Sequence, residues 1–308
     1  MSILVTGGAG FIGSNFLHHL STTTDEEIVC IDKLTYAGDR KNIPSDVRLY
    51  TTDIAEEGSC ESIFNRHKIK TVFNFAAESH VDNSIKGCSE FIHTNISGTV
   101  NLLNLALKNE VERFIHISTD EVYGSIEWGS FTETSLYSPR NPYSASKAAS
   151  DHFVMAYHHT YGLPVNITNC SNNYGPRQYT EKLIPKAITN ILNDKKVPVY
   201  GDGSQVRDWI YVLDHCHALV KVWRNGVNGE KYNIGGLCEV RNVDLVKKIL
   251  TMMGKDESMI EYVDDRPGHD RRYSTSIEKA KNELFWHPLF TLDYGLQKTI
   301  EWYESSRN

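Results

Sequence analysis

Residues 3–15 read ILVTGGAGFIGSN, an apolar run that passes directly into a glycine-rich loop and then into a helical pattern. Gly7, Gly10 and Gly13 follow a G-x-x-G-x-x-G spacing, and a second frame, G-x-G-x-x-G, starts at Gly8. Glycines let the backbone turn tightly and approach a pyrophosphate, whose charge is met by the N-terminus of the following helix. The stretch therefore predicts the first strand, turn and helix of a dinucleotide-binding fold.

The first half of the chain repeats this alternation of strand and helix. Short β-branched runs recur as ILVTGG, EIVCID, KTVFNFAA and RFIHIS, separated by segments with helical periodicity. This order predicts an α/β fold with a doubly wound parallel sheet and ligands above the carboxyl ends of its strands. We expect a Rossmann-type domain over residues 1–170, to which segments near 205–235 return. The second half of the chain mixes strands (VNITNC, KVPVYGDG, EKYNIGG) with a helix (LIPKAITNILN), and a smaller lobe should come mainly from residues 171–308.

Asp32 closes the second predicted strand, within reach of an adenosine ribose. A carboxylate there accepts hydrogen bonds from the ribose hydroxyls and repels a 2′-phosphate, which favours NAD over NADP. The adjoining Lys33 weakens this preference slightly. A tight turn without a cofactor is the alternative interpretation of the glycine loop.

Tyr143 and Lys147 form a Tyr-x-x-x-Lys pair in NPYSASK. Asn141 and Pro142 ahead of the pair are typical of a helix start, so both side chains should share one helical face. A phenol needs its pKa lowered by about 3 units to act as a base at neutral pH, and a nearby cation supplies about 1–3 units. We expect this lowering from Lys147, aided by the positive charge of an oxidised nicotinamide. In isolation the pair would be interpreted as a solvated surface pair.

The segment STDEVYG follows the predicted strand RFIHIS and places Thr119, Asp120 and Glu121 at its carboxyl end. Two adjacent carboxylates can act as separate acid and base if their surroundings split their pKa values. A solvated turn is the alternative.

Composition narrows the partners. The 308 residues carry a net charge of −7, which argues against nucleic acid and against an anionic membrane surface. No apolar run reaches the length of a membrane span, and the strand starting at Ile3 leaves no room for a secretory signal. Six cysteines without CxxC spacing indicate reduced thiols in a cytoplasmic protein. His215, Cys216 and His217 are adjacent in a helical pattern where neighbours splay apart, so we expect no metal site.

Cations gather late in the chain, where arginine forks could match a diphosphate. They are Arg207 in QVRDW and the group Arg266, His269, Arg271 and Arg272 in DRPGHDRRY.

Taken together, these motifs resemble the dTDP-glucose 4,6-dehydratases of the extended short-chain dehydrogenase/reductase group. The resemblance covers nearly the full length, with DKLTYAG and STDEVYG far more specific than the general fold motifs. It further includes FAAESHVD, TNISGT, TNCSNNYGP, EKLIP, PVYGDG and YNIGG.

The resemblance implies a transient oxidation with bound NAD that converts dTDP-glucose to dTDP-4-keto-6-deoxyglucose and water. Tyr143 would be the base for oxidation at carbon 4, Lys147 its partner, and Thr119 would bond to the sugar hydroxyl. Asp120 would be the acid for loss of water, and Glu121 the base at carbon 5.

The resemblance also implies the binding residues. Those for NAD would be Gly7, Gly10, Phe11, Ile12, Gly13, Asp32, Lys33, Leu34, Thr35, Asp53, Ile54, Ala77, Ser79, Thr94, Tyr143, Lys147 and Asn172. Those for the nucleotide sugar would be Ser79, Thr119, Asn173, Lys182, Pro198, Tyr200, Arg207, Asn242 and His269.

Three positions depart from the family pattern. Arg177 and Thr180 stand where an aromatic residue and a proline are usual, and Asn83 replaces a usual arginine. The first two should adjoin the nucleotide pocket, so they leave dTDP against UDP open.

Three other functions stay open on sequence grounds. They are a UDP-glucose 4,6-dehydratase, a nucleotide-sugar 4-epimerase and a non-catalytic dinucleotide sensor. An intact Tyr143–Lys147 pair argues against the sensor, and Asp120 with Glu121 argues against the epimerase. The apolar helices in GTVNLLNLALKN and around Tyr143 predict a homodimer joined by a four-helix contact.

Overall fold

The computed structural model describes residues 2–265 and 268–306, and its centre is a seven-stranded parallel sheet. In sequence order the strands are β1 (Ser2–Thr6), β2 (Glu27–Asp32), β3 (Arg48–Thr51), β4 (Ile69–Asn74), β5 (Arg113–Thr119), β6 (Val165–Cys170) and β10 (Glu230–Ile234). Across the sheet they run β3-β2-β1-β4-β5-β6-β10, with every neighbouring pair parallel. The order reverses between β1 and β4, the switch point at which such sheets bind ligands. The predicted Rossmann-type α/β fold is confirmed.

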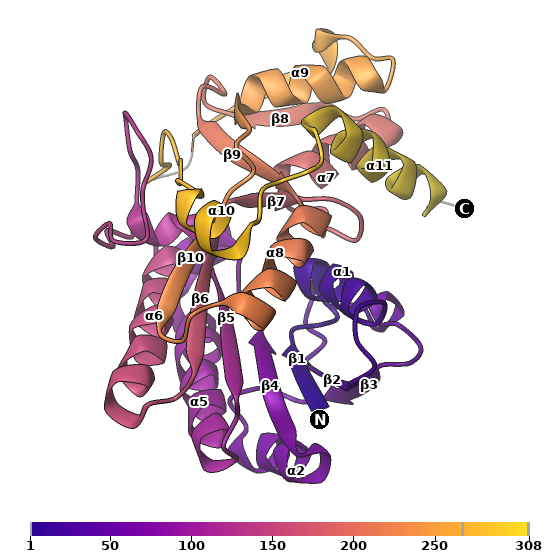
Figure 1. Ribbon diagram of the computed structural model, residues 1–308. Coiled ribbons are helices and arrows are strands. Elements are labelled where there is room, and N and C mark those ends of the chain that lie inside the picture. The colour runs from indigo at the N-terminus through magenta and orange to yellow at the C-terminus, as the bar shows by residue number, and fades with distance from the viewer. Residues whose placement is uncertain (1, 266–267, 307–308) are drawn as a thin grey trace.

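Period-two alternation in β1 divides the core into two layers. Ile3 and Val5 pack into one cluster with α1 (Phe11–Leu20) and α8 (Val212–Asn225), whereas Leu4 packs into another on the opposite face. Helices α2 (Glu57–His67), α5 (Thr99–Lys108) and α6 (Pro142–Tyr161) cover that opposite face. The sheet is thus enclosed between two helical layers (Figure 1).

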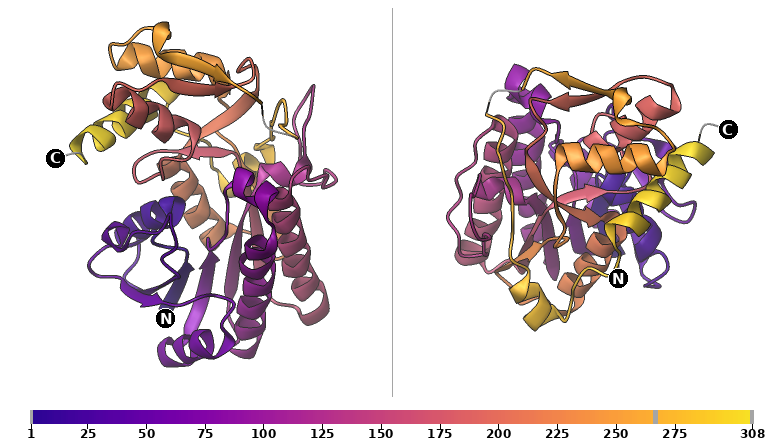
Figure 2. Two further views of the ribbon diagram at one scale, coloured as in Figure 1. Left: turned by 180° about the vertical axis from the view of Figure 1, so that it is seen from behind. Right: turned by 90° about the horizontal axis from the view of Figure 1, so that it is seen from above.

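A second lobe sits over one end of the sheet, as both views in Figure 2 show. Its own core joins two small sheets to three helices. The three-stranded sheet runs β11-β9-β7, and β12 pairs in parallel with β8. The elements are β7 (Asn172–Tyr174), α7 (Leu183–Leu192), β8 (Val197–Tyr200), β9 (Val206–Tyr211), β11 (Glu239–Arg241), α9 (Asn242–Met252), β12 (Ile260–Val263) and α11 (Leu292–Ser305).

The chain passes between the lobes repeatedly. After β9, helix α8 and strand β10 pack back onto the large sheet, and α10 (Glu278–Leu284) contacts both. Between these returns, β11, α9 and β12 lie in the second lobe. Short elements complete the structure: α3 (Val81–Lys86), α4 (Ser89–Phe91), a π-helix (Ile92–Gly98), and 3₁₀ turns at Arg40–Asn42, Asp120–Tyr123 and Glu257–Met259.

Within the described part of the chain, no helix is both long and apolar enough to cross a lipid bilayer. All six cysteines are free, and Cys30, Cys60, Cys170 and Cys216 are buried.

Candidate active site

A deep cleft separates the carboxyl edge of the large sheet from the second lobe. It is lined by every residue predicted to bind cofactor or substrate, or to act in catalysis, except Leu34. Leu34 has a left-handed backbone (φ 55°), and its amide donates to Asp32 Oδ1 at 2.8 Å. It therefore holds the Asp32 carboxylate, while its side chain does not line the cleft.

The glycine loop leaves room for a pyrophosphate at the start of α1. Gly7 has a positive φ of 67°, and a Cβ on Gly13 would lie 2.3 Å from the Gly7 oxygen. Gly10 forms the N-cap of α1, and no described side chain caps that end. The first-turn amides and the positive end of the helix dipole are thus left for an anion. The residues present fit the diphosphate of a dinucleotide.

The carboxylates beside the loop favour an unphosphorylated ribose. Asp32 is 8% exposed, and its Oδ2 accepts from the Ala9 amide at 2.8 Å. Lys33 was expected to weaken the NAD preference, but its Nζ lies 2.7 Å from Asp53 Oδ2. His93 Nε2 also lies 3.0 Å from that oxygen. Because Lys33 is paired with a carboxylate, its positive charge is offset. The negative charge of Asp32 therefore dominates beside the ribose and disfavours a 2′-phosphate.

Helix α6 begins as the sequence predicted. Asn141 is its N-cap, Pro142 occupies the first turn, and Asn141 and Ser144 form a reciprocal capping box. Lys147, one turn beyond Tyr143, is 3% exposed, and its Nζ donates to the Ile117 carbonyl at 2.8 Å. Burial lowers the pKa of Lys147 to about 8. A small change around this ammonium therefore decides whether it is charged near neutral pH.

The predicted lowering of the Tyr143 pKa is not found in the protein alone. Burial first, and then the nearby charge of Glu121, raises the pKa of Tyr143 well above its usual value. The Lys147 ammonium points at the Ile117 carbonyl, and the expected lowering of the Tyr143 pKa by this cation is not seen. Further positive charge in the cleft is needed before Tyr143 can act as a base.

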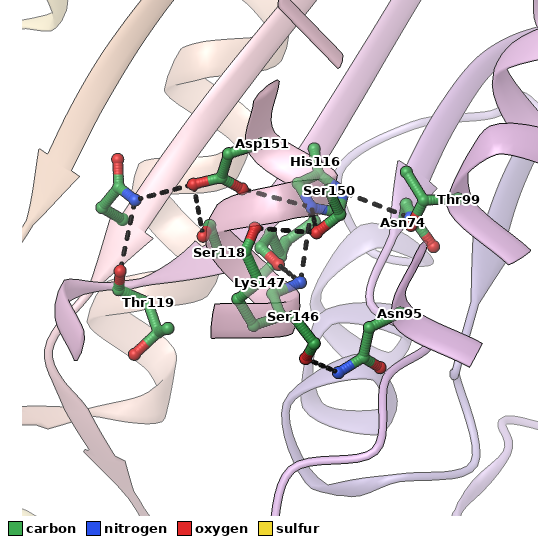
Figure 3. A network of polar contacts seen from close by, with 12 residues as sticks. Asn74, Asn95, Thr99, His116, Ser118, Thr119, Ser146, Lys147, Ser150 and Asp151 are labelled. Atoms are coloured by element: carbon green, nitrogen blue, oxygen red, sulfur yellow. Dashed lines mark hydrogen bonds and ion pairs between the residues drawn. The ribbon is translucent and has the colours of Figure 1, made fainter. Parts of the chain in front are cut away.

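Beneath Lys147 lies a closed polar network inside the domain (Figure 3). The buried His116 ring lies 3.4 Å from Lys147 Nζ, 3.1 Å from Asn74 Nδ2 and 3.4 Å from Asp151 Oδ1. Burial, with the Lys147 charge, lowers the pKa of His116 well below its usual value, so the ring is neutral. The network joins β4, β5 and α6 into one rigid support for the reaction centre.

Asp151 anchors this network. Its Oδ2 accepts from Ser118 Oγ at 2.8 Å, Tyr137 OH at 2.9 Å and Asn169 Nδ2 at 3.4 Å. Burial raises the pKa of Asp151, whereas the charge of Lys147 lowers it. In return, the carboxylate of Asp151 raises the pKa of Lys147 against the effect of burial.

The two adjacent carboxyl groups meet different surroundings. Asp120 is 2% exposed, and burial, then the charge of Glu121, raises its pKa well above its usual value. Glu121 is partly exposed, and its Oε2 accepts from Asn141 Nδ2 at 3.2 Å. Thr119 Oγ1 links them, since it donates to Asp120 Oδ1 at 3.3 Å and accepts from the Glu121 amide at 3.2 Å. A protonated Asp120 can donate a proton, so the pair is no solvated turn.

The late cations only partly reach the cleft. Arg207 and His269 line it, but Arg272 is held by Glu239 through bonds of 2.6 and 2.7 Å and donates to the Gly129 carbonyl. Arg271 is exposed and does not line the cleft. Arg266 lies outside the described residues. The predicted arginine cluster is therefore wrong for Arg271 and Arg272, because Glu239 competes for one and solvent surrounds the other.

Tyr273 is a lining residue that the sequence patterns did not indicate. It is 2% exposed, its ring centroid lies 4.4 Å from Arg207 Cζ, and its hydroxyl donates to Asp270 Oδ2 at 2.5 Å. Arg207 also donates to the Asp270 carbonyl at 2.9 Å. The segment 270–273 thus holds the Arg207 guanidinium against the cleft.

The adjacent His215, Cys216 and His217 diverge on α8. His215 Nδ1 lies 3.0 Å from Asn173 Oδ1, Cys216 is fully buried, and His217 contacts His19 edge-on. In the part of the chain that the structure describes, no group of three or more His, Cys, Asp or Glu side chains is placed to hold a metal ion.

Comparison with known proteins decides between the families that share this cleft. The family model described as GDP-mannose 4,6 dehydratase matches residues 4–299. The dTDP-glucose 4,6-dehydratase of Xanthomonas campestris pv. campestris (strain B100) is 48% identical over 97% of this chain and 92% of its own length. The chain belongs to the dTDP-glucose 4,6-dehydratase family. The resemblance drawn from the motifs is confirmed.

Solved structures show that enzymes of different activity share this fold. The dTDP-glucose 4,6-dehydratase of Streptomyces venezuelae, crystallised with NAD bound, has a TM-score of 0.96 and 45% identity, covering 100% of this chain and 98% of that one. A UDP-glucose 4-epimerase from Thermotoga maritima, solved with UDP-glucose, has a TM-score of 0.94 at 31% identity, covering 100% of both chains. The backbone alone thus does not separate dehydratase from epimerase, whereas sequence identity is higher to the dehydratase, at 45% against 31%.

The three departures from the family pattern lie off the cleft. Arg177 Nη1 donates to Asn15 Oδ1 at 3.1 Å, and neither Arg177 nor Thr180 lines the cleft, although Tyr179 and Glu181 do. Asn83 is exposed on α3. The expected effect of Arg177 and Thr180 on the nucleotide pocket would therefore have to be indirect.

Proposed function

We propose that the protein converts dTDP-glucose to dTDP-4-keto-6-deoxyglucose and water. The observation that carries this proposal is the placing of Asp120 and Glu121 in one cleft with Tyr143 and Lys147. The 48% identity to relatives named dTDP-glucose 4,6-dehydratase supports it further.

NAD fits the glycine loop, Asp32 and the paired Lys33. When bound, it would supply the hydride acceptor for carbon 4 of the sugar and the hydride donor for carbon 6. The residues that would bind NAD are those of the glycine loop, together with Asp32, Asp53 and Thr94 along the cleft. Because the hydride is returned, the protein should turn over without net NADH and without added NADP.

Each catalytic side chain then has one proton to move. Tyr143 takes the proton of the carbon 4 hydroxyl, with Lys147 beside it, and Thr119 is placed to hydrogen-bond the same hydroxyl. The resulting ketone acidifies the carbon 5 proton, which Glu121 removes; after the hydride reaches carbon 6, Glu121 returns a proton, exchanged with solvent, to carbon 5. Asp120, whose pKa is raised by burial, gives its proton to the departing carbon 6 hydroxyl, so water leaves instead of hydroxide.

The lobes divide the ligands. Residues 1–170 with α8 and β10 would hold NAD. Residues 171–308 would mainly hold the nucleotide sugar, through Arg207, Asn242 and His269. The arginine fork of Arg207 suits a diphosphate.

A homodimer is part of the proposal. The outer faces of α5 and α6 expose Leu107, Phe153 and Tyr161, the last of them 57% exposed. A second copy would cover these side chains through four helices. A mass of 35.0 kDa in light scattering, that of one chain, would exclude it.

The free thiols favour a reducing compartment such as the cytoplasm.

The decisive experiment is incubation with dTDP-glucose and, separately, with UDP-glucose, in heavy water. We expect the dTDP product to lose the mass of one water and to carry deuterium at carbon 5. Dehydration of UDP-glucose alone would move the assignment to the uridine nucleotide. A product of unchanged mass, without deuterium and epimerised at carbon 4, would replace the dehydratase by an epimerase.

A further inference from the structure

Asn141 is the N-cap of α6, and its side chain reaches two functional groups at once. Its Oδ1 accepts from the Ser144 amide at 2.8 Å. Its Nδ2 donates to Glu121 Oε2 at 3.2 Å. One planar amide therefore joins the start of the helix that carries Tyr143 to the carboxylate proposed to act at carbon 5.

The cap fixes which way this amide faces. A backbone N–H needs an acceptor, so the Asn141 oxygen must be the atom that meets Ser144, and the NH₂ group is turned toward Glu121. A second capping bond runs from the backbone N–H of Asn141 to Ser144 Oγ at 3.2 Å and holds the residue by its main chain. The donor offered to Glu121 is thus held in place from two directions.

Glu121 needs such a donor more than Asp120 does. Asp120 is enclosed by the protein, whereas Glu121 is partly exposed and has a longer side chain with one more rotatable bond. The backbone of Glu121 is fixed by a hydrogen bond from its N–H to Thr119 Oγ1. That bond leaves the carboxylate free to rotate, and Asn141 supplies a contact that selects one orientation.

We propose that Asn141 is a positioning residue for the carbon 5 proton transfer, acting through Glu121. This inference rests on the proposed function, because it takes Glu121 as the base. Serine also caps helices, but its hydroxyl is too short to reach Glu121, and an aspartate carboxylate caps without offering a donor, whereas the asparagine amide does both. An amide at the N-cap thereby ties the base at carbon 5 to the helix that presents Tyr143 at carbon 4.

Two variants separate the cap from the donor. Asn141→Ser keeps a capping oxygen and is too short to donate to Glu121, and Asn141→Asp keeps the cap but offers an oxygen where the NH₂ was. Asn141→Ala, which loses both, is the matched control for the cap. Four quantities are measured for each: the Tm, the KM for dTDP-glucose, the absorbance of bound NADH, and the rate of deuterium uptake at carbon 5.

For Asn141→Ser we expect a Tm within about 2 °C of wild type, because serine caps as well as asparagine. Carbon 4 oxidation and KM should be unchanged, while carbon 5 exchange slows about ten- to a hundredfold, as expected for a misplacement of about 1 Å. Bound NADH should accumulate. Asn141→Asp should slow exchange at least as much, because it places a second carboxylate against Glu121.

Wild-type exchange in Asn141→Ser would overturn the inference. An equal fall in carbon 4 oxidation and carbon 5 exchange would also overturn it, since Asn141 would then merely place the helix. Failure of the proposed function would appear differently, as wild-type protein that takes up no deuterium at carbon 5.

Discussion

The floor of the cleft and its upper wall are built in opposite ways. The floor, around Lys147, His116 and Asp151, is a closed hydrogen-bonded network within one domain. The upper wall, around Arg207 and Tyr273, is gathered from distant segments of the second lobe. The side chains proposed for the chemistry therefore belong to one hydrogen-bonded unit of a single domain, whereas those proposed for substrate recognition come from separate segments of the second lobe.

The comparison predicts that floor substitutions change kcat and wall substitutions change KM. The largest effects should come from the carboxyl pair on the floor. Asp120→Asn removes the acid for the leaving hydroxyl and Glu121→Gln the base at carbon 5, a loss that typically costs about 10²–10⁴ in rate. Both variants should still form some bound NADH, since neither group is needed for carbon 4 oxidation.

Absorbance of the bound cofactor, product mass and deuterium content report these steps separately. Glu121→Gln should also suppress deuterium uptake. If both variants dehydrate at the wild-type rate, the chemistry does not lie in this part of the floor.

The pH dependence tests the floor next. Activity that needs a protonated Lys147 is complete below its pKa of about 8 and falls as the pH rises through that value. Asp151→Asn removes the carboxylate that raises this pKa, so the alkaline limb should move to lower pH by about one unit or more. At pH 8 a one-unit shift should cut kcat about fivefold, because the protonated fraction of Lys147 falls from about one half to about one tenth, with little change in KM.

The pH profile of kcat distinguishes this effect from loss of folding, which would lower the rate at every pH. Ser118→Ala, which removes one of the bonds to Asp151 but no charge, is the matched control. An Asp151→Asn profile with an unmoved alkaline limb would contradict the role of this anion.

On the upper wall, Arg207→Ala should weaken nucleotide-sugar binding about ten- to a hundredfold, the effect of losing about 1.5–3 kcal/mol from a charged hydrogen bond. Arg207→Lys keeps the charge but loses the fork that also holds the Asp270 carbonyl. The affinity of Arg207→Lys for the nucleotide sugar should lie between those of wild type and Arg207→Ala. An unchanged KM in Arg207→Ala would remove this residue from the substrate site.

The smallest effect should come from Arg272→Ala. Although this residue lies in the same arginine-rich segment, its guanidinium is paired with Glu239 away from the cleft. We expect KM to change less than about threefold, and stability to fall by about 1 kcal/mol, as for a partly exposed pair. A tenfold rise in KM would show that the wall extends farther than its lining residues.

Sequence patterns predicted the local elements of the first domain better than the short strands of the second lobe, and the physical reason is locality. The glycine loop and the start of α6 depend on neighbouring residues, so propensity and capping rules suffice for them. The strands β7 and β11 have three residues each and mostly polar letters, and only long-range pairing with β9 makes them strands. No local rule indicates such pairing.

Side-chain partners were the second limit. Asp151 follows Lys147 at helical spacing, but the sequence does not show that folding buries both side chains. The rise of the Tyr143 pKa comes from the same burial, which a sequence does not display. Tyr273 ends the DRPGHDRRY segment but was not expected to line the cleft, because its place depends on the distant Arg207.

The last strand of the large sheet has a consequence for synthesis on the ribosome. Strand β10 pairs with β6 although about sixty residues separate them in the chain, among them β7, α7, β8 and β9 of the second lobe. A nascent chain that ends at Cys170 would present β6 as a bare edge and leave uncovered the apolar surface that α8 and α10 later bury. The first domain can close only after Ile234 has left the exit tunnel, and α10 follows later still. Slow translation through residues 171–234 would therefore prolong the state most prone to aggregation.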